Sequence, residues 1–205
     1  MGFLFKKIET FIQSIDTDSV FVEIGSDRGE GSTEYFSRLA LKNNTKLITV
    51  DIDANVGNRL SQVIPKNIYD NIEFVTASGR TWAETKISNY NKKICCLYLD
   101  NFDYDWDVYK VNNQSVMNRM IDTQKADYLT RGVEMTNRNC LVEHLAQMVA
   151  LLPHMAERSI VICDDTVTFN DCYIGKGGAV VPYLLVHGYE ILLAEDHGVI
   201  LGRNI

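Results

Sequence analysis

The chain has 205 residues, of which 46% are hydrophobic and 23% charged, and its formal net charge is −7 at pH 7. This length predicts a single domain over residues 1–205, and the acidic balance without a basic run disfavours binding to a nucleic-acid backbone. The five cysteines include no CxxC pair, which favours reduced, buried cysteines in a cytoplasmic protein over disulfides or zinc.

Residues 1–16 predict an N-terminal helix. Apolar residues fall on one helical face: Leu4, Ile8, Phe11, Ile12 and Ile15. Lys6 and Lys7 interrupt the apolar run, so it is too short for a signal peptide or a membrane span. We expect this helix to dock on the domain itself or on a second copy of the chain in a homodimer.

From residue 19 onward, β-branched apolar runs alternate with helical patterns. Strands are expected at 19–25, 46–53, 71–79, 93–106 and 159–166, with helices at 32–42, 56–64, 140–153 and 179–188 between them. A closing hairpin at 189–203 places one antiparallel strand at an edge. The pattern predicts an α/β fold with a doubly wound, mainly parallel seven-stranded sheet.

Two segments depart from this alternation. Residues 105–139 are polar and weakly patterned, and they are too long for an ordinary connection. We expect them to form an inserted lid with helices of its own. Residues 173–179 (YIGKGGA) are interpreted as a flexible turn, with a mobile substrate loop that brings Lys176 near the site as the alternative.

Polar or acidic side chains follow every predicted strand. Parallel strands end at one edge of a sheet, where ligands of such folds bind. The groups expected at that edge are Glu23 with the glycine turn, Asp51 and Asp53, Thr76 to Ser78, Asp100 and Asp103, and Asp164 and Asp165.

The turn VEIGSDRGEGST (22–33) follows the first strand. Its glycines give G-x-x-x-G-x-G, which is neither a P-loop nor a dinucleotide fingerprint. The acids Glu23, Asp27 and Glu30 would repel a phosphate and favour a ligand with a zwitterionic end. Asp51, at the end of the second strand, is placed to accept hydrogen bonds from ribose hydroxyls. S-adenosylmethionine has both features.

The same turn reads E-x-G-x-x-R-G-x-x-S and resembles motif I of class I S-adenosylmethionine-dependent methyltransferases, in particular macrocin-type O-methyltransferases. LITVDID resembles their ribose-binding strand and FVTASG their adenine-contacting segment. The resemblance covers about residues 20–104 and 140–203. It implies a Rossmann-like methyltransferase fold and methyl transfer to a small-molecule hydroxyl. The implied cofactor-binding residues are Glu23, Gly25, Ser26, Arg28, Gly29, Ser32, Asp51, Ala77, Ser78 and Asp100.

LYLDNFDYDW with IVICDDT resembles the metal-binding acids of macrocin-type and catechol-type enzymes. The resemblance implies that Asp100, Asp164 and Asp165 bind Mg²⁺, or Mn²⁺ or Ca²⁺. Catechol-type enzymes carry a lysine three residues after the first of these acids, where this chain has Asp103. Asp103 is therefore the candidate base, with Asp100 beside it. In the alternative, Asp164 and Asp165 only cap a loop, and Asp100 contacts only the cofactor.

Several readings stay open. His144 is expected in the core more than in catalysis, and Trp82, Tyr104 and Trp106 suit packing or stacking on a ligand. A nucleotide-sugar transferase, for which Asp51-x-Asp53 would be a weak motif, or an NAD-dependent enzyme is one alternative function. A non-catalytic cofactor-binding module is another.

Overall fold

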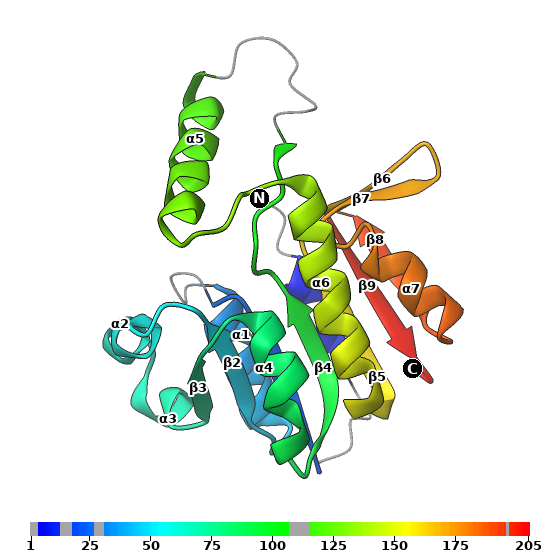
Figure 1. Cartoon of the computed structure of the whole chain (residues 1–205). Helices are drawn as coiled ribbons and strands as arrows, with labels where there is room; N and C mark the ends of the chain where they lie inside the picture. The colour runs from blue at the N-terminus through cyan, green and yellow to red at the C-terminus, as the bar shows by residue number, and fades with distance from the viewer. Residues whose placement is uncertain (1–3, 13–17, 27–30, 107–114, 196) are drawn as a thin grey trace.

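The structure, a computed structural model, describes residues 4–12, 18–26, 31–106, 115–195 and 197–205, and only the backbone of 115–121. Seven strands form one sheet in the order β3-β2-β1-β4-β5-β9-β8, and β9 alone among them runs in the opposite direction to the other six (Figure 1). They are β1 (Ser19–Ile24), β2 (Leu47–Asp51), β3 (Ile72–Thr76), β4 (Lys93–Leu99), β5 (Met155–Cys163), β8 (Glu190–Glu195) and β9 (Gly198–Arg203). The predicted doubly wound, mainly parallel sheet is confirmed.

The register of the parallel strands aligns their carboxyl ends. Ile24 of β1 pairs with Val50 of β2 and with Leu99 of β4, and Leu99 pairs with Cys163 of β5. The next residue along each strand therefore lies in one row, and this row is Gly25, Asp51, Asp100 and Asp164. Strand order reverses between β1 and β4, so the row crosses the topological switch point of the sheet.

Helices cover both faces of the sheet, because the central strands are apolar on both sides. Trp82 of α4, Met148 of α6 and Leu184 of α7 are buried against one face (Figure 1). Phe36 of α1 and Ile8 of η1 are buried against the other. The helices are η1 (Leu4–Thr10), α1 (Ser32–Lys42), α2 (Val56–Val63), α3 (Lys66–Tyr69), α4 (Gly79–Thr85), η2 (Ile87–Asn89), α5 (Ser115–Thr130), α6 (Asn137–Leu151), η4 (Leu152–His154) and α7 (Val180–Val186).

The N-terminal segment docks on the domain itself. Leu4, Phe5, Ile8 and Ile12 are all buried in the core between the sheet, η1 and α1. Of the two expectations for this segment, packing on its own domain is confirmed over the described residues. Among the described helices, none combines the length and the apolar character that a membrane crossing requires.

The antiparallel strand is not at the edge, and this part of the prediction is wrong. β9 lies between β5 and β8, so β8 is the edge strand. The burial of the two strands explains the order. β9 (GVILGR) is buried over its first five residues, whereas β8 (EILLAE) has two exposed residues at each end and intermediate burial only at Leu192 and Leu193. The more apolar strand takes the interior position.

A second hairpin, β6 (Thr166–Phe169) and β7 (Cys172–Gly175), follows β5 and projects from the sheet (Figure 1). The turn expected at 173–179 is confirmed for residues 176–179 and wrong for the first three residues, which belong to β7. The predicted lid region contains one long helix, α5, and residues 107–114 lie outside the described part of the chain.

Candidate active site

The turn after β1 packs tightly on the loop after β4. Gly25 has a φ of +95°, and a Cβ built on it would lie 2.5 Å from the backbone nitrogen of Asn101. Any side chain here would combine a left-handed backbone with a direct clash. Gly25 therefore lets β1 and β4 end side by side. The last peptide groups of these strands lie at the carboxyl edge, which is the edge of the sheet where the parallel strands end.

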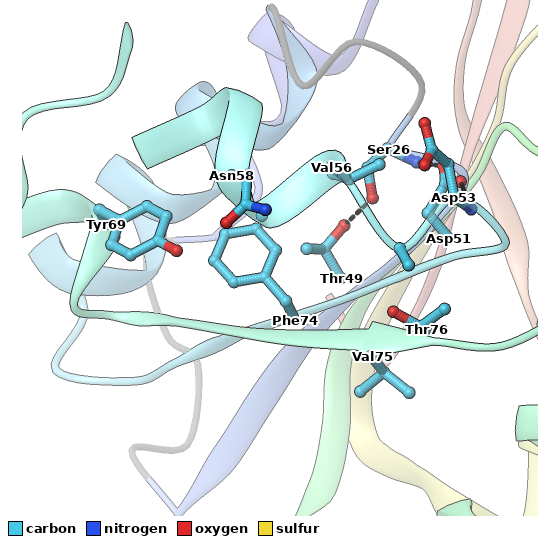
Figure 2. Close-up of a pocket in the computed structure, with 12 residues that line it drawn as sticks. Ser26, Thr49, Asp51, Asp53, Val56, Asn58, Tyr69, Phe74, Val75 and Thr76 are labelled. Carbon is cyan, nitrogen blue, oxygen red and sulfur yellow. Dashed lines mark hydrogen bonds between the residues drawn. The ribbon is translucent and has the colours of Figure 1, made fainter. Parts of the chain in front are cut away.

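Asp51 is held in place by backbone donors. The N–H of Ser26 donates to its Oδ2 at 2.9 Å, and the N–H of Asp53 donates to its Oδ1 at 2.8 Å (Figure 2). Both oxygens are thus fixed by the turns after β1 and β2.

Asp53 has a different task. It accepts from the N–H of Asn55 at 2.8 Å and pairs with Arg59 at 2.5 Å, and the Arg59 guanidinium lowers the pKa of the Asp53 carboxyl. It therefore anchors the entry into α2. A cavity of about 140 Å³ lies between β2, β3 and α2, and Ser26, Asp51, Val56, Phe74 and Thr76 are among its lining residues (Figure 2).

Glu23 lies beneath the turn rather than on its surface. The side chain is fully buried, and Thr33 and Thr49 donate to its Oε2 at 2.7 Å each. Burial raises the pKa of Glu23, and the two threonine hydrogen bonds partly offset this. Its Oε1 has no hydrogen-bond partner among the described residues. Glu23 thus supports the turn, and one buried oxygen remains available as an acceptor.

The segment after β3 carries the two residues expected near adenine. Ala77 packs against the core, and its N–H bonds the carbonyl of Asp51 at 2.9 Å. Ser78 caps α4, since its Oγ accepts from the N–H of Thr81 at 3.1 Å. Ile52 is not among the residues that the sequence analysis names as candidates for contact with a ligand. Its apolar side chain is 53% exposed between Asp51 and Asp53. An apolar residue between two acids, in the sequence DID, is the signal that could have identified it.

The structure describes only some of the other predicted cofactor residues. Ser32 is the first residue of α1 and is buried. Arg28 and Gly29 lie outside the described residues.

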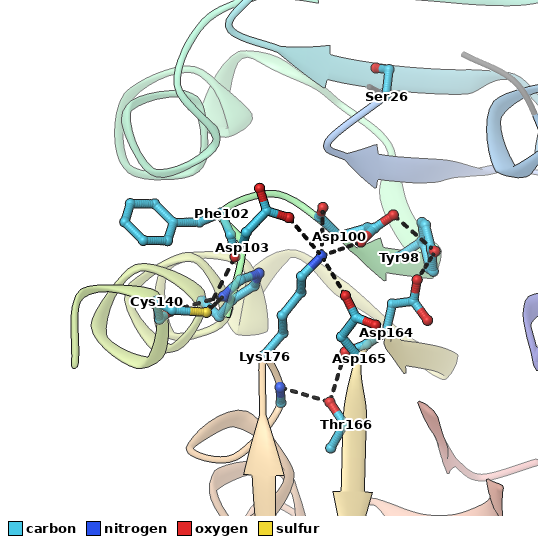
Figure 3. A network of polar contacts seen from close by, with 12 residues as sticks. Ser26, Tyr98, Asp100, Phe102, Asp103, Cys140, Asp164, Asp165, Thr166 and Lys176 are labelled. Atoms are coloured by element: carbon cyan, nitrogen blue, oxygen red, sulfur yellow. Dashed lines mark hydrogen bonds and ion pairs between the residues drawn. The ribbon is translucent and has the colours of Figure 1, made fainter. Parts of the chain in front are cut away.

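The acids after β4 and β5 converge, as their strand order predicts, but around a lysine. Lys176 Nζ lies 2.6 Å from Asp100 Oδ1 and 3.1 Å from Asp165 Oδ2, and 3.9 Å from Asp103 Oδ1 (Figure 3). The Lys176 side chain is only 3% exposed. A buried ammonium therefore occupies the middle of the carboxylate group.

Tyr98 closes the other side of this group. Its hydroxyl lies 2.8 Å from Asp164 Oδ2 and 3.2 Å from Asp100 Oδ2 (Figure 3). Asp100 is thus the central carboxylate, with Lys176 at one oxygen and Tyr98 at the other. The remaining acids each face one of these two donors.

The charges of the group oppose one another. Burial raises the pKa of Asp100 to about 7, the Lys176 ammonium lowers it, and Asp164 raises it. The pKa of Asp164 is also raised, by burial and by Asp165. Burial alone would lower the pKa of Lys176, but the carboxylates of Asp100, Asp165 and Asp103 hold it well above its usual range. Lys176 is therefore a permanent cation.

The β6–β7 hairpin brings Lys176 to the acids. Thr166 pairs with Gly175, so Asp165 and Lys176 are the next residues on either strand. The N–H of Lys176 donates to the carbonyl of Asp165 at 3.0 Å, and the N–H of Gly177 donates to Thr166 Oγ1 at 2.8 Å. The lysine backbone is thus fixed on both sides.

The loop after β4 joins the group to α5. Phe102 has a φ of +55°, which points Asp103 back toward the cluster. The N–H of Asp103 donates to the hydroxyl of Tyr128 at 2.8 Å, and the rings of Phe102 and Tyr128 lie 4.7 Å apart. Lys125 of α5 pairs with Asp105 at 2.6 Å. Helix α5 therefore borders the site through its last turns.

The predicted metal ligands do not fit a metal ion in this arrangement. Lys176 Nζ contacts Asp100 Oδ1 and Asp165 Oδ2, and it stands where the ion would contact these two acids. Within the described ranges there is no group of three or more His, Cys, Asp or Glu side chains arranged to hold an ion. In the capped-loop alternative Asp164 and Asp165 would bond loop backbone, whereas their side chains contact Tyr98 and Lys176.

Of the remaining candidates, His144, Trp82 and Tyr104 are buried, whereas Trp106 is half-buried. His144 is buried, with Nδ1 2.9 Å from the carbonyl of Cys140, and Trp82 is fully buried. The rings of Tyr104 and Trp106 lie 4.8 Å apart. All five cysteines are free, and Cys172 alone is exposed, whereas burial was expected for every one.

The chain resembles solved structures in fold. They include an rRNA methylase from Streptococcus thermophilus (11% identity, TM-score 0.55, 99% of this chain and 97% of that one). CalS11, a TDP-rhamnose 3′-O-methyltransferase of calicheamicin biosynthesis, matches with 12% identity, a TM-score of 0.59, and coverage of 99% and 79%. SMU.1697c from Streptococcus mutans, in complex with S-adenosylhomocysteine, matches with 13% identity, a TM-score of 0.51, and coverage of 98% of each chain. The fold is the Rossmann-like fold of methyltransferases. No family model matches the sequence, and no curated protein matches it.

Proposed function

We propose that this protein is a cytoplasmic, S-adenosylmethionine-dependent methyltransferase that methylates a hydroxyl of a small molecule. One observation carries the proposal: the fixed carboxylate of Asp51 and the carboxylate group around Asp100 lie in one row, on either side of the Gly25 turn. A nucleoside bound at one end of this row would direct its tail toward the other. The likeness to methyltransferase structures supports the same reading.

The residues fit the cofactor. Asp51 offers a fixed carboxylate to the ribose, and the exposed side chain of Ile52 offers an apolar surface to the base. Asn101 follows Asp100 and packs on Gly25, and its buried Oδ1 has no partner among the described residues. That oxygen and Glu23 Oε1 are the acceptors available to a cationic amino-acid tail. The predicted roles of Gly25, Ser26 and Ser32 in the turn belong to the same proposal.

The chemistry needs a base near the acceptor. S-adenosylmethionine supplies a methyl group on a cationic sulfur, and the acceptor oxygen takes this methyl as its proton leaves. Asp100 is the first choice for that proton, because it ends β4 at the switch point and burial raises its pKa to about 7. Asp103 is the second choice, because its side chain is 37% exposed and it points to the same lysine.

The acceptor would enter between the β4 loop and α5. A cavity of about 470 Å³ lies there, and it is lined by Asp105, Lys125, Leu129, Met135 and Asn137 among others. Its size suits a small molecule, and the net charge of −7 disfavours a nucleic acid. The divalent metal expected from the sequence has no part in this proposal.

The experiment is isothermal titration of the full chain with S-adenosylhomocysteine, NAD and a UDP-sugar. Binding of S-adenosylhomocysteine alone supports the proposal. Binding of NAD or the UDP-sugar alone contradicts it and favours another enzyme on a doubly wound sheet. The engagement of Asp53 by Arg59 already weakens the D-x-D reading. A non-catalytic module would bind S-adenosylhomocysteine and transfer no labelled methyl group to any hydroxyl compound of a diol and phenol panel.

A further inference from the structure

The group around Lys176 has the composition of a metal site with the metal exchanged for an ammonium. Carboxylates from the ends of two adjacent strands, Asp100 and Asp165, face one point, and that point is held by Lys176 Nζ (Figure 3). A divalent ion binds carboxylate oxygens at about 2.0–2.6 Å. The ammonium contacts the same oxygens at 2.6 and 3.1 Å, so ion and ammonium exclude one another by space and by charge.

We propose that Lys176 is the resident cation of this site, and that its ammonium replaces a divalent metal ion in holding the β4 and β5 carboxylates together. The inference deepens the proposed function, because it makes Lys176 the positioning residue for Asp100. It predicts a metal-independent enzyme.

Several observations support a built position for Lys176 rather than a chance surface contact. The side chain is 3% exposed, whereas lysine is among the residues least often buried. Its backbone is fixed by Asp165 on one side and, through Gly177, by Thr166 on the other. Thr166 in turn donates to the carbonyl of Asp164 at 2.8 Å. The lysine and two of its acids are therefore held by one hydrogen-bonded unit.

Gly175 is required for this unit. Its φ is +98°, and a Cβ built on it would lie 1.8 Å from the carbonyl oxygen of Asp165. Only glycine lets the end of β7 approach the Asp165 peptide so closely. This close approach delivers the lysine to the carboxylates.

Electrostatics explains why removal of the ammonium should admit a metal. Four carboxylates, Asp100, Asp103, Asp164 and Asp165, surround one cation, so the group keeps an excess of negative charge. Without Lys176, their mutual repulsion would be relieved by any small cation that reaches them. Oxygen-only ligands favour Mg²⁺ or Mn²⁺.

The test is Mn²⁺ titration of the full chain, read by the electron paramagnetic resonance signal of free Mn²⁺. Wild type should leave this signal unchanged up to about 1 mM Mn²⁺, because Lys176 Nζ already occupies the point where the ion would contact Asp100 and Asp165. Lys176→Ala, which removes charge and volume, should bind one Mn²⁺ at least about tenfold more tightly than wild type. Adding Asp164→Asn to Lys176→Ala should abolish the new binding.

Two control variants test whether Mn²⁺ binding depends on the space left by the Lys176 side chain. Lys176→Met removes the charge but keeps the side-chain volume, so it should bind less Mn²⁺ than Lys176→Ala. Lys66→Ala removes a lysine of α3 from an exposed ion pair with Asp70 and should behave like wild type. Thermal melting of each variant establishes that it is folded.

The proposal would be overturned if wild type binds Mn²⁺ and Asp164→Asn removes this binding. This comparison needs no Lys176 variant, so it can be made even if Lys176→Ala fails to fold. A folded Lys176→Ala that binds no Mn²⁺ would overturn it as well. The titration uses neither cofactor nor acceptor. A failure of the methyltransferase proposal would appear instead as absent S-adenosylhomocysteine binding, so the two failures are distinguishable.

Discussion

The two halves of the carboxyl edge fix their acids by different means. On the β1–β2 side, backbone N–H groups of Ser26 and Asp53 hold Asp51, and a cavity remains beside it. On the β4–β5 side, the side chains of Lys176 and Tyr98 hold Asp100. Backbone donors hold Asp51 beside this cavity, whereas side-chain donors fill the space between the acids on the other side.

The difference indicates a division of labour. The first half is a binding surface whose shape depends on main-chain turns, and side-chain substitutions outside Asp51 should affect it little. The second half is a group of opposite charges around Lys176, in which each member sets the position of its neighbours. Substitutions in the two halves should therefore change different quantities, namely cofactor affinity in the first and turnover or stability in the second.

The largest effect is expected for Asp100→Asn. Loss of a general base typically lowers turnover by 10²–10⁴-fold, so kcat should fall by about a thousandfold. The affinity for S-adenosylhomocysteine should change much less, because Asp51 is untouched. Methyl transfer from labelled cofactor and titration calorimetry give the two values. Asp103→Asn is the matched comparison, with an expected loss of about tenfold. The reverse order would make Asp103 the base.

Gly175→Ala should disrupt the β4–β5 half of the edge, because it displaces the backbone that positions Lys176 against the acids. Its Cβ would meet the carbonyl oxygen of Asp165 at 1.8 Å, so we expect the free energy of unfolding to fall by about 4 kcal/mol. Gly188→Ala is the control, because Gly188 has a similar φ of +82° but open space around it. It should cost only about 1 kcal/mol. Urea unfolding measures both, and equal losses would refute a specific role for the Gly175 contact.

Asp51→Ala should break the first half. It removes charge-assisted hydrogen bonds to the ribose and the acceptor of the Ser26 N–H, so S-adenosylhomocysteine affinity should fall about a hundredfold. Asp53→Asn should leave the affinity within about threefold, because Asp53 faces Arg59. Titration calorimetry gives both values. A larger loss for Asp53→Asn would move the ligand to the α2 side.

The sequence predicts the first half better than the second. Strand ends follow from apolar runs, and parallel pairing places Asp51, Asp100 and Asp164 in one row without knowledge of side-chain contacts. The positions of the acids could therefore be predicted. What lies between them could not be inferred from the strands alone, and a metal was the obvious cation for three converging aspartates.

The β6–β7 hairpin carried a local signal that the sequence reading missed. Asn170 and Asp171 have φ values of +48° and +60°, and they join two four-residue strands. Asparagine and aspartate tolerate this left-handed turn, and the flanking TVTF and CYIG suit strands. Recognising the hairpin would have paired Asp165 with Lys176. The burial of the lysine would still have been unexpected, because lysine is normally a surface residue.

The smallest expected effect concerns His144, whose pKa reports the charge of Lys176 in the β4–β5 half of the edge. This pKa is lowered to about 4, chiefly by burial and also by the Lys176 ammonium, while the carbonyl of Cys140 and the carboxylate of Asp165 oppose this. The folded state thus binds a proton more weakly than the unfolded state, so this stability is present above the unfolded pKa of about 6.5 and is lost as pH falls toward 4. From pH 7 to pH 5 the loss attributable to His144 should be about 2 kcal/mol.

Urea unfolding of wild type and His144→Gln between pH 7 and pH 5 measures this contribution, and the variant should show the shallower loss. In Lys176→Met the repulsion from the ammonium is gone, so the His144 pKa, followed by its imidazole NMR shifts, should rise toward its usual value. A His144 pKa that is the same in wild type and Lys176→Met would mean that burial alone sets it. The Lys176 ammonium would then have no electrostatic effect on His144, and the coupling between neighbours that we infer for the β4–β5 half would be wrong.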